Sequence, residues 1–138
     1  MRRLYRADAA ERDRVRRALV EALRSEPDVG WAWLHGSFLG DGGFHDVDVG
    51  VHLAAAEDAH VERALDLGLR LDRATRFPVD VQVLNGAPAS FLFHVFRDGH
   101  LLLCRDDTGL ANRMERTVRE YLDVAPLRRR AVIEAFGA

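Results

Sequence analysis

Residues 46–53 alternate between apolar and polar side chains, a pattern that predicts a β-strand. Valine recurs at every second position from Val47, and Asp46 and Asp48 fall on the positions between. Because side chains at i and i+2 of a strand share a face, this strand has one apolar face for a core. Its other face carries both aspartates.

Residues 79–84 repeat the alternation, with Asp80 and Gln82 opposite three valines. Two further segments predict strands for a different reason. Val29–His35 and residues 100–105 are short apolar runs bounded by turn residues, which is typical of buried strands. The chain therefore supplies four predicted strands.

Apolar residues recur every three or four positions between these strands, as they do in amphipathic helices. The expected helical segments are Ala7–Arg24, Ala54–Arg76, a short helix or turn over Phe91–Phe96, and a helix from Thr108 into the C-terminal tail. In the second helix, Val61, Leu65, Leu69 and neighbouring leucines are expected to form the buried stripe. Residues 38–45 hold three glycines and predict a loop or a short irregular helix.

The length and composition are those of one folded domain. The chain has 138 residues, of which 48% are hydrophobic and 30% charged, so it can bury a core without disulfide or metal cross-links. We expect residues 1–138 to form a single α/β domain with a mixed β-sheet flanked by helices. Residues from about 108 to 138 would form a C-terminal helical tail.

Charge and cysteine content exclude several classes of function. The net charge of -2 gives no basic field for non-specific nucleic-acid binding, so no direct nucleic-acid contact is expected. All basic residues other than histidine are arginines, which excludes Schiff-base and P-loop lysine chemistry. Cys104 is the only cysteine, and we expect it to be an inert buried thiol. With no apolar run near the length of a membrane span, we expect a cytoplasmic protein without a membrane contact.

Asp46, Asp48 and Asp80 are the candidate chemical centre. If the two alternating strands are neighbours, the three carboxylates gather on one face, and three anions so close together call for a cation. Ligand sets made of oxygen alone select hard ions such as Mg²⁺ or Mn²⁺. Bound divalent ions of this kind support phosphoryl or nucleotidyl transfer.

Gly36 and Ser37 are the candidate phosphate-binding residues. Glycine allows the backbone to approach a phosphate closely, and the following N–H groups and the serine hydroxyl can bind its oxygens. A Gly-Ser pair alone is most often only a turn. Its position just before an Asp-x-Asp strand makes the phosphate-binding interpretation much more specific.

The sequence resembles the polymerase β-type nucleotidyltransferase superfamily, and within it the minimal nucleotidyltransferase (MNT) antitoxins. The resemblance rests on Leu34-His35-Gly36-Ser37, Asp46-Val47-Asp48-Val49-Gly50-Val51 and Val79-Asp80-Val81, and it extends over nearly the whole chain. Later segments that are similar to MNT antitoxins are Asn85-Gly86-Ala87-Pro88, residues 96–103 and residues 119–123.

This resemblance implies a nucleotidyltransferase-type domain whose partner is a HEPN ribonuclease toxin. Active MNT antitoxins transfer AMP from ATP to a toxin tyrosine. Asp46, Asp48 and Asp80 would then be catalytic and would bind the metal, with Asp80 also helping to deprotonate or position the acceptor hydroxyl. Gly36 and Ser37 would hold the nucleotide triphosphate, and the chain would form a hetero-oligomer with its toxin.

Two departures from the family pattern lie between Ser37 and Asp46. This segment is shorter and richer in glycine than is common, and it lacks the usual arginine. His45 stands where a small hydroxyl residue often precedes Asp-x-Asp. Two alternative functions stay open, namely a catalytically silent antitoxin that acts by binding alone and a small-molecule nucleotidyltransferase that modifies an antibiotic.

Overall fold

The structure is a computed structural model that describes residues 2–136, with the side chains of 124–128, 132 and 136 left out. A four-stranded sheet forms its centre, in the order β3-β2-β1-β4. The strands are β1 (Val29–His35), β2 (Val47–Leu53), β3 (Val79–Val83) and β4 (His100–Cys104). β1 is antiparallel to β2 and β4, whereas β2 and β3 are parallel. The predicted α/β class with a mixed sheet is confirmed.

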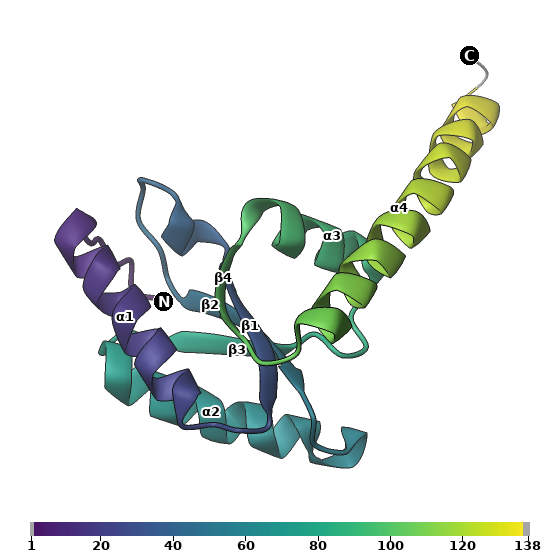
Figure 1. The fold of residues 1–138 in the computed structure, drawn as a ribbon. Coiled ribbons are helices and arrows are strands. Elements are labelled where there is room, and N and C mark those ends of the chain that lie inside the picture. Colours follow the sequence, from purple (N-terminus) through teal and green to yellow (C-terminus); the bar gives the residue numbers. More distant parts are fainter. Residues whose placement is uncertain (1, 137–138) are drawn as a thin grey trace.

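Helices cover both faces of this sheet (Figure 1). α1 (Ala9–Arg24) and α2 (His60–Thr75) lie on one face, and α3 (Ala89–Asp98) and the start of α4 (Asp107–Phe136) lie on the other. Two short 3₁₀ turns, η1 (Ser37–Leu39) and η2 (Glu57–Ala59), precede β2 and α2 respectively. Within residues 2–136, none of the helices combines the length and apolar character needed to cross a membrane.

The second helix begins later than the sequence predicts, at His60 rather than Ala54. The alanines at 54–56 favour a helix by composition, but the Ala54 N–H donates to the Asp28 carbonyl oxygen (2.8 Å) and Ala56 is extended. The hydrogen bond from Ala54 to Asp28 extends the chain beyond β2 along the loop before β1. A tertiary hydrogen bond therefore outweighs local helix propensity here.

The apolar faces of the strands pack against α1 and α2. The valines of β2 are fully buried, as are Leu19 of α1 and Leu67 of α2. A second cluster on the other face contains Trp31 and Trp33 of β1, packed against α3 and the first turns of α4. Burial of this kind on both faces fixes which side chains of each strand remain available for a site.

The expected buried stripe of α2 is wrong in one respect. Leu67 and Leu71 are buried, but Val61, Leu65 and Leu69 are 76%, 67% and 59% exposed. The helix carries apolar residues on two opposite sides, since positions 65 and 67 are about 200° apart around the axis. Helical spacing identifies both stripes, but it does not tell which one faces the sheet.

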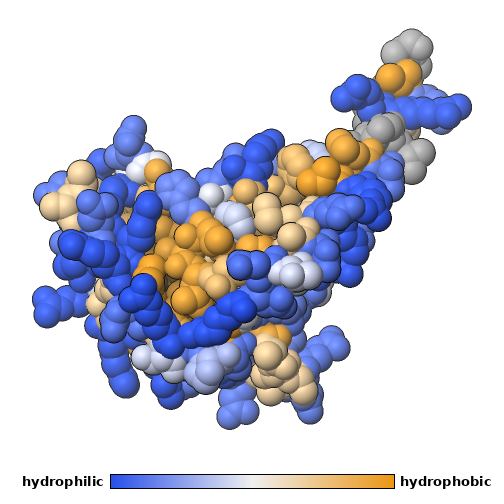
Figure 2. All heavy atoms as spheres, in the orientation of Figure 1, coloured by the Kyte–Doolittle hydropathy of each residue, from blue (hydrophilic) through white to orange (hydrophobic). Residues whose placement is uncertain are grey.

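The outer part of α4 extends away from the body of the protein (Figure 1). Leu110 is buried, whereas Val118 and Leu122 further along are 43% and 57% exposed. Figure 2 shows apolar side chains along this helix and an apolar patch in the middle of the same view. The helix therefore presents an apolar side that the rest of the chain does not cover.

Replacement of Leu67 by alanine tests the packing of α2. The free energy of unfolding should fall by about 2–5 kcal/mol because the change leaves a cavity in the core. Leu65→Ala, on the exposed side of the same helix, should change it by less than about 0.5 kcal/mol. Urea denaturation at low protein concentration measures both, and similar losses for the two variants would show that the helix is rotated from its position here.

Candidate functional site: three aspartates beside a glycine-serine turn

The parallel pairing of β2 and β3 brings the candidate carboxylates together at the beginnings of these two strands. Asp48 and Asp80 lie directly opposite one another in the register, and Asp46 immediately precedes β2. All three line one polar pocket of about 360 Å³, together with Ser37, Arg2 and His45. This pocket is on the face that the valines leave free.

Gln82 connects the acidic residues to the end of β1. Its amide Nε2 donates to Asp48 Oδ1 (3.0 Å) and to Asp80 Oδ2 (2.8 Å). Its Oε1 lies 2.6 Å from His35 Nε2, which makes that ring nitrogen the donor. The alternation of β3 places Gln82 on the acidic face, and its position two residues after Asp80 is the sequence signal for this role, which the motif alone does not assign.

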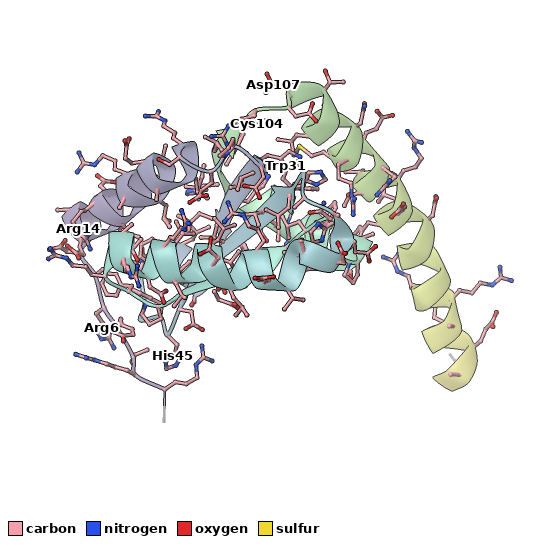
Figure 3. The ribbon with its side chains drawn as sticks, turned by 90° about the horizontal axis from the view of Figure 1, so that it is seen from below. Arg6, Arg14, Trp31, His45, Cys104 and Asp107 are labelled. Atoms are coloured by element: carbon pink, nitrogen blue, oxygen red, sulfur yellow. The ribbon has the colours of Figure 1, made fainter. Side chains whose placement is uncertain are left out.

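Arg2 reaches the pocket from the N-terminal segment and forms an ion pair with Asp46. The segment is held in place because Tyr5 and Phe44 exchange two backbone hydrogen bonds (2.8 and 3.0 Å). Figure 3 shows His45 beside this segment, where its Nδ1 donates to the Arg3 carbonyl oxygen (2.8 Å). An arginine is therefore present at the site, although the loop before Asp46 supplies none.

Burial raises the pKa of the Asp48 carboxyl above its ordinary value. The hydrogen bond from Gln82 and the nearby His35 act in the opposite direction, while the charges of Asp80 and Asp46 raise the pKa further. Asp48 is thus a carboxylate whose negative charge is disfavoured by its surroundings. A bound cation would reverse this balance.

Gly36 forms the turn between β1 and η1, and its backbone requires glycine for two reasons. Its φ of 81° lies in the region that other residues avoid. A Cβ at this position would also overlap the carboxylate of Asp48. Because Gly36 has no side chain, the Asp48 carboxylate can lie close to the backbone of the turn that precedes Ser37.

The glycine-rich loop that follows is held by Arg12 of α1. The guanidinium donates to the carbonyl oxygens of Phe38 and Gly42 and lies over the Phe38 ring, 5.1 Å from its centroid. Three glycines alone would leave this loop with many conformations. Arg12 thereby fixes the path of the chain from Ser37 to Asp46.

The chemistry of the three carboxylates suits a divalent cation. Three carboxylates supply oxygen ligands of the type that Mg²⁺ and Mn²⁺ prefer. In the described part of the chain, however, no three His, Cys, Asp or Glu side chains are already arranged as a metal-ligand group. Asp46 is turned toward Arg2, and Asp48 and Asp80 share the Gln82 amide. Metal binding would require the side chains to leave these partners and stays a prediction.

His52 lies away from this site. It is near the far end of β2 and stacks on Trp31, with ring centroids 4.8 Å apart. Burial lowers the pKa of its imidazole. Asn85, from the segment that resembles MNT antitoxins, hydrogen-bonds both the N–H and the carbonyl of Leu53 (2.9 and 2.8 Å) and so prolongs the β2–β3 pairing.

A sheet of this order, with a glycine-serine turn facing an Asp-x-Asp strand, defines a nucleotidyltransferase-type domain. The family model described as "Polymerase beta, Nucleotidyltransferase" matches residues 17–108, which is more than half of the chain. The chain belongs to this family. No curated protein matches its sequence significantly.

Solved structures of toxin–antitoxin complexes contain chains with the same fold. One, described as a tri-AMPylated Shewanella oneidensis HEPN toxin in complex with MNT antitoxin, aligns with a TM-score of 0.67 and 21% identity over 92% of this chain and 99% of the other. A toxin–antitoxin structure with AMP-PNP gives a TM-score of 0.68 and 22% identity, over 89% and 98% of the two chains. At this identity, the likeness establishes the fold.

Gly36→Ala tests the close approach of the turn to Asp48. The positive φ and the overlap with the carboxylate should lower the free energy of unfolding by about 1–3 kcal/mol and weaken Mn²⁺ binding. Gly42→Ala is the matched control, because a Cβ there meets no atom within 4 Å. Urea denaturation and metal titration measure the two effects. Equal behaviour of both variants would mean that the turn is not constrained.

Asp48→Asn tests the penalty on the buried charge in the metal-free protein. Because the folded-state pKa is raised above 3.8, the wild type should lose stability relative to the variant as pH rises from that value through the raised pKa. Well below pH 3.8 the carboxyl is protonated in both states, so the difference between the two proteins should no longer change with pH. Urea denaturation of the wild type and of Asp48→Asn across this pH range measures the trend. A pH-independent difference for Asp48→Asn would contradict the burial argument.

Proposed function

We propose that this protein is a metal-dependent adenylyltransferase antitoxin that transfers AMP from ATP to a tyrosine of a HEPN toxin and thereby neutralises it. The observation that carries the proposal is the grouping of Asp46, Asp48 and Asp80 in one polar pocket beside Gly36 and Ser37. Family membership supports the reaction class. The fold shared with antitoxin complexes, one of them with an AMPylated toxin, supports the acceptor.

Gly36 and Ser37 would bind the triphosphate. Ser37, the first residue of η1, lines the pocket together with the aspartates, and its hydroxyl and the N–H groups of this turn would bind the phosphate oxygens. When Asp46 binds a metal ion, Arg2 would leave that carboxylate and pair with a phosphate oxygen instead. This exchange keeps the guanidinium paired throughout and supplies positive charge for the triphosphate.

Divalent ions held by the carboxylates would neutralise the negative charge that develops in the reaction. The acceptor oxygen would attack the α-phosphorus of ATP, forming a phosphodiester as the bond to the bridging oxygen breaks and pyrophosphate leaves. Asp80 would accept the tyrosine proton or align the hydroxyl. Gln82 would hold Asp80 in position, since it links that carboxylate to His35. Positioning and charge neutralisation would provide most of the acceleration.

The proposal includes a cytoplasmic location, because ATP is supplied there. It also includes a hetero-oligomer with the toxin. Two alternative functions are distinguished by the experiment below. One is a silent antitoxin that binds the toxin without modifying it, and the other is an enzyme that modifies a small molecule such as an antibiotic.

Carboxylate substitutions test the reaction directly. With ATP, Mg²⁺ and the HEPN partner, the wild type should add AMP to the toxin, and Asp46→Asn, Asp48→Asn or Asp80→Asn should each reduce the rate by about 100-fold or more. Asp41→Asn, which removes a carboxylate from the neighbouring exposed loop, should keep the full rate. Intact-mass spectrometry of the toxin measures the label, and circular dichroism checks that each variant is folded.

Three results would count against this assignment. Full labelling by the three variants would remove the proposed centre. Binding and inhibition of the toxin without any label by the wild type would favour the silent antitoxin. Labelling of an aminoglycoside-type acceptor in place of the toxin would favour the small-molecule enzyme.

A further inference from the structure

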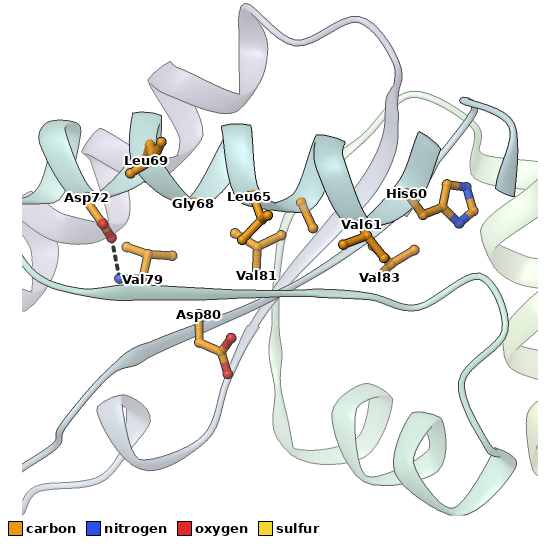
Figure 4. A pocket seen from close by; sticks show the side chains of 11 residues that line it. His60, Val61, Leu65, Gly68, Leu69, Asp72, Val79, Asp80, Val81 and Val83 are labelled. Atoms are coloured by element: carbon orange, nitrogen blue, oxygen red, sulfur yellow. Dashed lines mark hydrogen bonds between the residues drawn. The ribbon is translucent and has the colours of Figure 1, made fainter. Parts of the chain in front are cut away.

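A groove of about 630 Å³ lies between α2 and β3, on the opposite side of β3 from the aspartate pocket (Figure 4). Its walls are mainly apolar. The principal lining residues are Val61, Leu65, Leu69, Val79, Val81 and Val83. The three residues from α2 are the strongly exposed stripe of that helix. Exposed apolar side chains gathered along a groove usually mark a surface that another molecule covers.

β3 is also an edge strand. It is the last strand in the sheet order, and among residues 2–136 no strand pairs with its outer side. The Leu84 N–H bonds to Val51 on β2, so in a parallel ladder the backbone groups of Val81 and Val83 face outward. Asp72 accepts the Val79 N–H (2.6 Å) and covers one position. The remaining edge can accept a further strand.

The order of residues along the exposed side of α2 is self-complementary for two antiparallel copies of the helix. Every fourth position from η2 through α2 gives, in order, Glu57, Val61, Leu65, Leu69 and Arg73. The stripe thus has an acid at one end, a base at the other and three apolar residues between. Neither Glu57 nor Arg73 forms a salt bridge with any other residue that the structure describes.

The midpoint of the exposed stripe of α2 lies beside the midpoint of β3. Figure 4 shows Val61, Leu65 and Leu69 following the order Val83, Val81 and Val79, because α2 and β3 run in opposite directions. Leu65 and Val81 are therefore the midpoints of the helical stripe and of the strand. One two-fold axis can pass through both.

We propose that a second copy of this chain covers the groove in a two-fold symmetric dimer. The two β3 strands pair antiparallel and make one continuous sheet, while the two α2 helices pack antiparallel. Leu65 then meets Leu65 of the other copy, Val61 meets Leu69, and Glu57 meets Arg73 at both ends. An interface with this self-complementarity is what two-fold symmetry requires.

The apolar side of α4 does not fill the groove of its own chain. α4 begins on the opposite face of the sheet from α2 and extends away from the body (Figure 1). Asp80 lines both the groove and the aspartate pocket, but its carboxylate points away from α2 (Figure 4), so the proposed contacts of α2 do not involve it. The proposal is therefore independent of the reaction assigned above.

Substitution at the axis is the first test. Leu65→Glu places two carboxylates against each other and should weaken dimerisation of the full chain by about 30-fold or more. Leu122→Glu, at an exposed leucine of α4 outside the groove, should have no effect. Light scattering and sedimentation across a range of concentrations measure the dissociation constant, and urea denaturation confirms that both variants fold.

Charge exchange tests the orientation of the helices. Glu57→Arg or Arg73→Glu alone should weaken the dimer by about 2- to 10-fold, since each change affects two contacts. The double variant exchanges the ends of the stripe and should restore wild-type dimerisation. A parallel arrangement of the helices would not show this rescue.

Cross-linking tests the position of the axis. In a Cys104→Ser background, Leu65→Cys should form a disulfide-linked dimer under mild oxidation, because residue 65 faces itself. Leu69→Cys should not, since residue 69 faces Val61 of the other copy. Cross-linking of both variants at equal rates would place the axis elsewhere and overturn the arrangement.

Two other outcomes would overturn the proposal. The wild-type chain could remain monomeric at all concentrations, or it could form a dimer that Leu65→Glu leaves intact. A monomer whose complex with a HEPN partner is abolished by Leu65→Glu would assign the groove to that partner instead.

Discussion

The pairing of β2 with β3 is the interaction on which the site depends. Its parallel register places Asp48 directly opposite Asp80, where like charges repel and lower the stability of the sheet. The Gln82 amide offsets part of this repulsion by donating to both carboxylates. Burial of the valines on the other face keeps the strands in this register, because a slip of one residue would turn the aspartates into the core.

The sequence predicts the strands well and the orientation of α2 poorly, for physical reasons. In β2 and β3, valines alternate with polar residues, so only one face can enter the core. In α2, Leu65 and Leu67 lie on opposite sides and both sides are apolar. Local spacing then contains no information about which side meets the sheet, and the start of the helix depends on a hydrogen bond to distant Asp28.

The candidate site could be predicted in part. Asp46, Asp48 and Asp80 share a face because of strand geometry, and Gln82 could have been included by the same rule. Arg2 could not, because its place depends on the pairing of Tyr5 with Phe44, far along the chain. The roles of these residues in metal and nucleotide binding stay predictions, as does the single-domain organisation of residues 1–138.

The path of the N-terminal segment has a practical consequence. Arg2 contacts Asp46, and the backbone from Arg3 to Tyr5 runs beside His45 and Phe44, so the beginning of this chain forms one wall of the pocket. Residues fused ahead of Arg2, such as a purification tag, would project from that wall and could obstruct a bulky acceptor. A tag for enzymology is better placed beyond α4, which points away from the body of the protein (Figure 1).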